Sequence, residues 1–180
     1  EDFQNALMYH NNTDKDSNTK FEVEGEARLE DLNVRGFYDI VSQTSSAEST
    51  EPYIRLHDIK TAASYSFRLK FGKNSQKSNK NRNHYLQLAT YGLAVKEKYG
   101  RLDEMSILYY NKDTSEIREV VVPNSYLDET KRYWFAINKE HERATAEGIA
   151  PRFSFGTSPV YNWVCKYCQF YDHCKPPVVI

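Results

Sequence analysis

Two aspartates and a lysine in the first third of the chain are residues that metal-assisted phosphodiester chemistry uses. Asp39 ends the sequence Gly-Phe-Tyr-Asp, and Asp58 precedes Lys60 by two residues. Side chains alternate between the two faces of a β-strand, so Asp58 and Lys60 share one face while Ile59 points to the other. One face of this strand therefore presents a carboxylate together with an ammonium group.

Two predicted strands would bring these groups together. Residues 34–41 and 53–60 are rich in β-branched and aromatic side chains, which predicts one strand around Asp39 and a second that carries Asp58. Two neighbouring carboxylates repel each other unless a cation lies between them, which favours Mg²⁺ or Mn²⁺. Lys60 would then position the attacking water and offset charge on the transition state. The alternative is that Asp58 and Lys60 form only a weak ion pair on a solvated face of the strand.

A polar pair follows on a predicted helix over residues 84–98. Gln87 and Tyr91 are four residues apart, so they lie on one face of that helix. The pair is either exposed to solvent, or it braces Lys60 or contacts a nucleic-acid backbone.

The chain has an uneven charge distribution, although its formal net charge is only −1. No Asp or Glu occurs between Asp58 and Glu97, and one stretch within that interval holds six basic residues: Arg68, Lys70, Lys73, Lys77, Lys80 and Arg82. Residues 72–83 are predicted to form a loop. The basic stretch either follows phosphates of a nucleic acid or is a solvated loop, and Tyr65 and Phe67 either stack on bases or pack in the core.

All three cysteines, Cys165, Cys168 and Cys174, lie within ten residues near the C-terminus. A disulfide with a free thiol, a zinc site and an iron–sulfur cluster are the alternatives. The odd number and the lack of a signal peptide argue against a secreted disulfide framework, so metal binding is the better interpretation. For Zn²⁺, His173 or Asp172 is available as a fourth ligand.

The remaining pattern predicts an α/β fold with a central mixed sheet flanked by helices. Hairpins are expected over 21–30 with 34–41 and over 104–110 with 116–122. A helix is expected from Asn124 or Ser125 to Glu147, with Tyr133, Trp134 and Ile137 in the core.

Length and composition bound the organisation of the chain. With 180 residues, 39% of them hydrophobic, one domain over 1–180 is expected, with a core over 21–147 and a cysteine segment over 148–180. There is no transmembrane run, signal peptide or phosphate-binding glycine-rich loop, which favours a cytoplasmic protein without ATP use.

The order Gly-x-x-Asp, Asp-x-Lys-Thr and Gln-x-x-x-Tyr over residues 21–110 resembles the RecB-type branch of the PD-(D/E)xK nuclease superfamily. This resemblance implies a restriction-endonuclease-like core in which Asp39, Asp58 and the Ile59 carbonyl bind the metal. It also implies that Lys60 is catalytic and that Gln87 and Tyr91 support the site or the substrate.

The cysteine spacing is similar to that of iron–sulfur nucleases in the same branch, which include CRISPR adaptation nucleases, AddB-type nucleases and phage-borne relatives. The resemblance implies a 4Fe-4S cluster, with Zn²⁺ as the alternative. Those nucleases have a fourth cysteine upstream, and this sequence contains no counterpart to it. They also have an upstream histidine, for which His10 is the one candidate here. The chain does not begin with methionine, which favours a missing N-terminal segment.

Together these features predict a divalent-metal-dependent DNA nuclease. The resemblance further implies an exonuclease acting on single-stranded DNA or DNA ends. The alternatives are a catalytically silent, zinc-stapled nucleic-acid-binding module and a docking subunit for a helicase or an integration complex. Intact Asp39, Asp58 and Lys60 favour the enzyme.

Overall fold

The computed structural model describes residues 5–9, 18–71, 81–149, 167 and 169. These residues belong to two compact units, one within Glu1–Asp128 and the other within Glu129–Ile180. Residues 5–9 are helical. The candidate catalytic residues all belong to the first unit.

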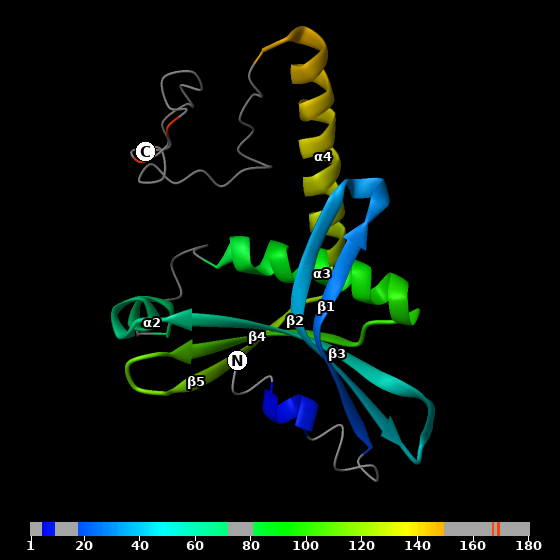
Figure 1. The fold of residues 1–180 in the computed structure, drawn as a ribbon, viewed down its shortest axis with the longest axis vertical. Helices are drawn as coiled ribbons and strands as arrows, with labels where there is room; N and C mark the ends of the chain where they lie inside the picture. Colours follow the sequence, from blue (N-terminus) through cyan, green and yellow to red (C-terminus); the bar gives the residue numbers. More distant parts are fainter. Residues whose placement is uncertain (1–4, 10–17, 72–80, 150–166, 168, 170–180) are drawn as a thin grey trace. The chain divides into compact units, whose positions relative to one another are not determined.

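A five-stranded mixed sheet forms the centre of the first unit (Figure 1). Its strands follow the chain in the order β1 (Thr19–Leu29), β2 (Val34–Ser46), β3 (Ser49–Ala62), β4 (Glu104–Asn111) and β5 (Ile117–Val122). Only the β3–β4 pair is parallel, and the other three pairs are antiparallel. This topology confirms the expected α/β class and is consistent with a restriction-endonuclease-like core.

Both predicted hairpins are present. The turn between β1 and β2 is a 3-10 helix (η1, Glu30–Leu32) followed by Asn33 at φ 52°, a left-handed conformation that asparagine tolerates better than most residues. The Ser/Thr-rich stretch between β2 and β3 continues both strands into a third hairpin.

Three helices complete the described elements: α2 (Ser64–Phe71), α3 (Arg82–Tyr99) and α4 (Ser125–Glu147). Residues 84–98 were expected to be helical, and α3 extends slightly beyond them. Gly100 follows the last residue of α3 and adopts φ 75°, as helix-terminating glycines commonly do. α2 had no counterpart in the sequence-based prediction. α3 links the parallel strands β3 and β4 and packs across β1 to β4 (Figure 1).

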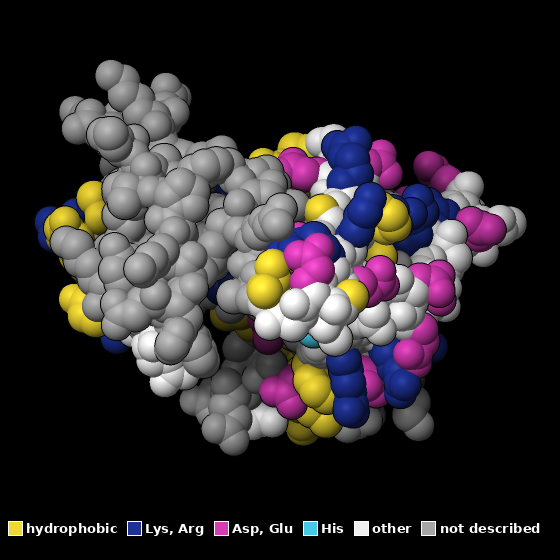
Figure 2. All heavy atoms as spheres, turned by 90° about the horizontal axis from the view of Figure 1, so that it is seen from above, with side chains coloured by type: hydrophobic (Ala, Val, Ile, Leu, Met, Phe, Trp, Pro, Cys, Tyr) yellow, Lys and Arg dark blue, Asp and Glu magenta, His cyan; other side chains and the backbone are white. Residues whose placement is uncertain are grey.

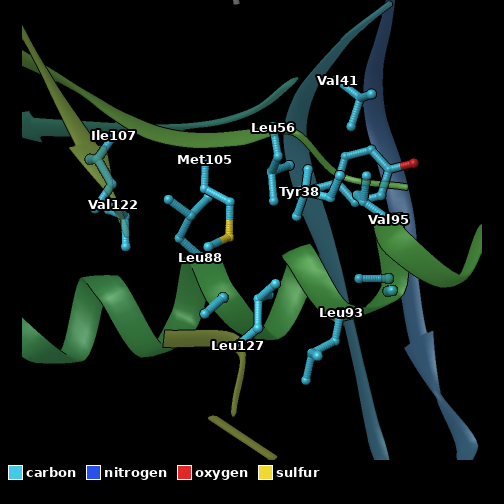
Figure 3. Packing of buried hydrophobic residues seen from close by; sticks show 14 of the residues in the cluster. Tyr38, Val41, Leu56, Leu88, Leu93, Val95, Met105, Ile107, Val122 and Leu127 are labelled. Carbon is cyan, nitrogen blue, oxygen red and sulfur yellow. The ribbon is translucent and has the colours of Figure 1, made fainter. Parts of the chain in front are cut away.

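The core lies between α3 and the sheet. Leu88 of α3 faces Leu56 and Met105 of the two parallel strands, and all three are fully buried (Figure 3). Gly92 allows this close approach, because a Cβ there would lie 2.6 Å from the Met105 sulfur. Burying a large apolar side chain contributes about 1.5–3 kcal/mol, so this layer fixes α3 firmly on the sheet.

The structure decides between the alternatives for several aromatic residues. Phe67 is 3% exposed and belongs to the core, whereas Tyr65 is 68% exposed. Tyr133, Trp134 and Ile137 were expected in the core, but each is only half-buried. A long amphipathic helix leaves part of its apolar stripe accessible, which accounts for the difference.

Basic and acidic side chains are interspersed over the described surface in the view of Figure 2. This distribution agrees with 24 basic and 25 acidic residues in the sequence. None of the helices in the described part of the chain is long and apolar enough to cross a membrane.

Candidate active site

Asp39 lies on β2 just before the point where this strand begins to pair with β3. The register of β2 with β3 starts at the pair Ile40 and His57, one residue beyond Asp39. On the β1 side, the pairs Val23–Ile40 and Gly25–Tyr38 flank Glu24 and Asp39, which are themselves not paired, and Glu24 has φ 55°, unusual for a residue with a side chain. The Ile59 backbone N–H donates to Asp39 Oδ2 over 2.6 Å. Asp39 is thereby tethered to the strand that carries Asp58.

Asp58 and Lys60 lie on the same face of β3, as their spacing predicted. Lys60 Nζ is 2.7 Å from Asp58 Oδ2, and the Asp58 side chain is 3% exposed. Burial raises the pKa of Asp58; the Lys60 ammonium opposes this shift, and the negative charge of Asp39 adds to it. The three residues expected to act together are therefore neighbours in the structure.

The two carboxylates suit a hard divalent cation. Asp58 Oδ2 is buried and accepts no well-directed hydrogen bond from a described residue, although Lys60 pairs with it electrostatically. A buried carboxylate oxygen without a hydrogen bond is costly, and a cation would relieve that cost. Among the described residues, no group of three or more His, Cys, Asp or Glu side chains is arranged to hold a metal. Mg²⁺ typically takes one or two carboxylates and keeps several waters, so two side chains suffice.

Gln87 and Tyr91 form a hydrogen-bonded pair on α3. Gln87 Nε2 donates to the Tyr91 hydroxyl over 3.0 Å. A Cβ on Gly36 would lie 3.0 Å from the Tyr91 ring, so this ring rests against β2 three residues before Asp39. Among the described residues, Gln87 hydrogen-bonds to Tyr91 and not to Lys60.

Two residues that sequence reasoning did not select lie beside this site. Tyr109 on β4 is in register with Lys60, and His84 Nδ1 is 2.9 Å from the Tyr109 hydroxyl. Burial lowers the pKa of His84 to about 4, with further contributions from the charges of Lys70 and Lys60. His84 is therefore neutral at physiological pH. Its position one helical turn before Gln87 is the sequence signal that could have identified it.

The other predicted residues are only partly described. Arg68 and Lys70 belong to α2, and Arg82 is the first residue of α3. The following lie outside the described residues: His10, Lys73, Lys77, Lys80, Cys165, Cys168, Asp172, His173 and Cys174.

Comparison with known proteins supplies one informative match. The model of a family described as the PD-(D/E)XK nuclease superfamily matches residues 3–175. No curated protein matches the chain. A solved structure titled "Crystal structure of SSO0001" is 16% identical with a TM-score of 0.44, and the alignment covers 98% of this chain and 69% of that chain. Similarity at this level carries no information about what the chain does.

Proposed function

This chain belongs to the PD-(D/E)XK nuclease superfamily, and we propose that it is a divalent-metal-dependent deoxyribonuclease whose active site contains Asp39, Asp58 and Lys60. Membership implies nuclease activity on a nucleic acid, and the superfamily typically uses divalent metal ions. The observation that carries the assignment is the buried Asp58 carboxylate, paired with Lys60 over 2.7 Å and placed beside Asp39.

In this proposal Asp39, Asp58 and the Ile59 carbonyl would hold Mg²⁺ or Mn²⁺. The bound cation would supply an activated water and polarise the scissile phosphate. Lys60 offsets the negative charge that develops on the phosphate oxygens as water attacks phosphorus and the P–O bond breaks. Gln87 and Tyr91 hold the adjoining α3 face against β2 and support the site.

The proposed substrate is single-stranded DNA or a DNA end, cut by an exonuclease. Its support is the order of the Asp, Asp-x-Lys and Gln-x-x-x-Tyr motifs, which resembles the RecB-type branch. The basic residues Arg68, Lys70, Lys73, Lys77, Lys80 and Arg82 would attract the phosphate backbone. Exposed Tyr65 on α2 is available for stacking on bases.

We further propose that residues 1–180 form one nuclease domain and that its cysteines hold a metal. Cys165, Cys168 and Cys174 would ligate a 4Fe-4S cluster, or Zn²⁺ as the alternative. The support is their spacing in the sequence. A helicase or an integration complex is the proposed partner, and its support is the similarity of the cysteine spacing to that of AddB-type and CRISPR adaptation nucleases.

The experiment that tests this function follows end-labelled single- and double-stranded DNA in Mn²⁺, Mg²⁺ or EDTA. We expect cleavage with Mn²⁺ or Mg²⁺ and none in EDTA. Release of mononucleotides from an end would support the exonuclease, whereas early products of intermediate length would indicate an endonuclease. Equal cleavage in EDTA, or no cleavage of either DNA with either metal, would overturn the proposal.

A further inference from the structure

Lys70 is a half-buried cation with neutral partners. Its Nζ donates to Asn81 Oδ1 over 2.6 Å and lies 5.0 Å from the centre of the Tyr109 ring. Burial lowers the pKa of Lys70. Within the described part of the chain, Lys70 forms no ion pair with a carboxylate, whereas Lys60 pairs with Asp58 and Lys98 pairs with Glu22.

His84 contributes a second polar group from α3. Its Nδ1 is 2.9 Å from the Tyr109 hydroxyl, and no described residue hydrogen-bonds to its Nε2. Burial raises the pKa of Tyr109, so its hydroxyl stays protonated and can donate to Nδ1. In that tautomer the proton of the neutral imidazole is on Nε2, which is then a hydrogen-bond donor.

The two groups meet around Tyr109, next to the candidate active site. Tyr109 and Lys60 are paired in the parallel register of β3 and β4, and paired strands lie about 4.8 Å apart. The charge of Asp58 contributes to the raised pKa of Tyr109, and the charges of Lys70 and Lys60 both contribute to the lowered pKa of His84. These interactions link Lys70 and His84 electrostatically to the Asp58–Lys60 pair.

We propose that Lys70 and His84 bind a phosphate group of the nucleic acid next to the scissile phosphodiester. This inference rests on the proposed function, because it assumes a nucleic-acid substrate. A half-buried ammonium without a counter-charge is costly, and a phosphate supplies both the missing charge and acceptors for two donors. The bound group is either an internal backbone phosphate or a terminal phosphate, since both present the same oxygens.

The first test measures binding of a fluorescein-labelled single-stranded oligonucleotide in EDTA over a range of salt concentrations. Lys70→Met should weaken binding about tenfold and reduce the slope of log affinity against log salt by about 0.7, the value for one single-strand phosphate contact. His84→Ala should weaken binding without changing this slope, because the imidazole is neutral. Lys70→Arg should keep the slope of the wild type.

Lys96→Met is the matched control. This exposed lysine lies near the C-terminal end of α3, whereas His84 lies near the N-terminal end. It makes the same change of charge and should leave affinity and slope as in the wild type. Lys70 also contacts Asn81, the residue before α3, so a purely structural role is the competing explanation. That role predicts a lower melting temperature for Lys70→Met with an unchanged salt slope, which would overturn the proposal.

The second test locates the phosphate. Substrates carry a single neutral methylphosphonate at each linkage in turn, or lack the terminal phosphate, and kcat/KM is measured with Mn²⁺. In the wild type, one such change beside the cut should lower kcat/KM about tenfold through KM. The same change should cost Lys70→Met nothing further, since the contact is already lost. The position of the effect distinguishes an internal phosphate from a terminal one.

The outcomes separate this inference from the proposed function. If the wild type cleaves DNA but Lys70→Met keeps its affinity, salt slope and methylphosphonate response, only the phosphate site is overturned. If the wild type neither binds nor cleaves DNA, the proposed function and the phosphate site are overturned together.

Discussion

The backbone N–H of Ile59 donates to Asp39 Oδ2 over 2.6 Å, immediately beyond the pair Ile40 and His57 where the register of β2 with β3 begins. One oxygen of Asp39 therefore tethers the two strands. The other oxygen accepts no hydrogen bond from a described residue, and it is the atom that we propose as the metal ligand. A single side chain thus combines a structural contact with a proposed metal contact, and substitution can separate the two.

Asp39→Asn should keep the fold while losing metal affinity. The asparagine side-chain oxygen can still accept from Ile59, so the free energy of unfolding should change by less than about 1 kcal/mol. The lost negative charge should weaken Mn²⁺ binding about tenfold or more. Even residues that only hydrogen-bond to a metal ligand typically change metal affinity by about tenfold or more when they are substituted. Calorimetric titration with Mn²⁺ measures the affinity.

Asp31→Asn is the control, because Asp31 is an exposed carboxylate in the η1 turn. It should bind Mn²⁺ as the wild type does. Unchanged Mn²⁺ affinity in Asp39→Asn would exclude Asp39 as a ligand.

His57 should make the stability of the protein depend on pH. Its ring lies 2.8 Å from the Ser106 hydroxyl and 3.3 Å from the Ser42 hydroxyl. Burial, together with the charge of Arg55, lowers its pKa from 6.5 to about 4, against the opposing charges of Glu119 and Glu104. As pH falls below 6.5, the unfolded chain takes up a proton at His57 before the folded protein does. This contribution to stability is therefore complete above pH 6.5 and is lost as pH falls towards 4.

The measurement compares denaturant unfolding of the wild type and His57→Gln at several pH values. The glutamine can hydrogen-bond to the serines but does not titrate. The difference in unfolding free energy should fall by up to about 1.4 kcal/mol per pH unit within that interval and level off on either side. Parallel pH profiles for the two proteins would show that His57 is not held neutral by the fold.

Gly25→Ala should destabilise the contact between β1 and β2. A Cβ at Gly25 would lie 2.2 Å from the Tyr38 ring, and the Tyr38 hydroxyl is held by a 2.9 Å hydrogen bond to Glu22. The ring cannot move aside without losing that bond, so we expect a cost of about 1–3 kcal/mol. The same substitution in a Tyr38→Ala background should cost much less. Equal costs in the two backgrounds, from urea denaturation, would contradict the packing described here.

Local pattern was sufficient to predict most of the fold around the candidate site. The alternation around Asp58 and Lys60 predicted a strand that presents both on one face, and their 2.7 Å contact confirms that arrangement. The apolar spacing of residues 84–98 predicted α3, and the start of α4 at Ser125 matches its predicted cap. These features depend on side chains that are close in the sequence, so periodicity and capping identify them.

Features that depend on distant residues could not be predicted in this way. The contact of His84 with Tyr109 requires the register of β3 with β4, which the sequence does not specify. The short helix α2 buries only Phe67 and leaves Tyr65 and Leu69 exposed, so it has no apolar periodicity to detect. Short elements of this kind are fixed by their neighbours.

The cysteine segment gives a prediction that depends on sequence alone. Cys168→Ser should release the bound metal and lower the melting temperature, because metal binding and folding are thermodynamically coupled. Elemental analysis of anaerobically purified protein distinguishes iron with sulfide from zinc. Neither metal in stoichiometric amount would contradict the proposed site.

The most direct test of the proposed active site is the single-turnover rate of DNA cleavage by Asp58→Asn and Lys60→Met at saturating Mn²⁺ and protein. Each change removes one partner of the buried 2.7 Å pair with little change in volume, and thermal unfolding would verify that the variants fold. We expect each rate to fall by a factor of about a hundred or more while DNA binding is retained, and Lys96→Met to cleave at the rate of the wild type. A folded Asp58→Asn or Lys60→Met protein that cleaves DNA at nearly the wild-type rate would contradict the assignment of these residues to the active site.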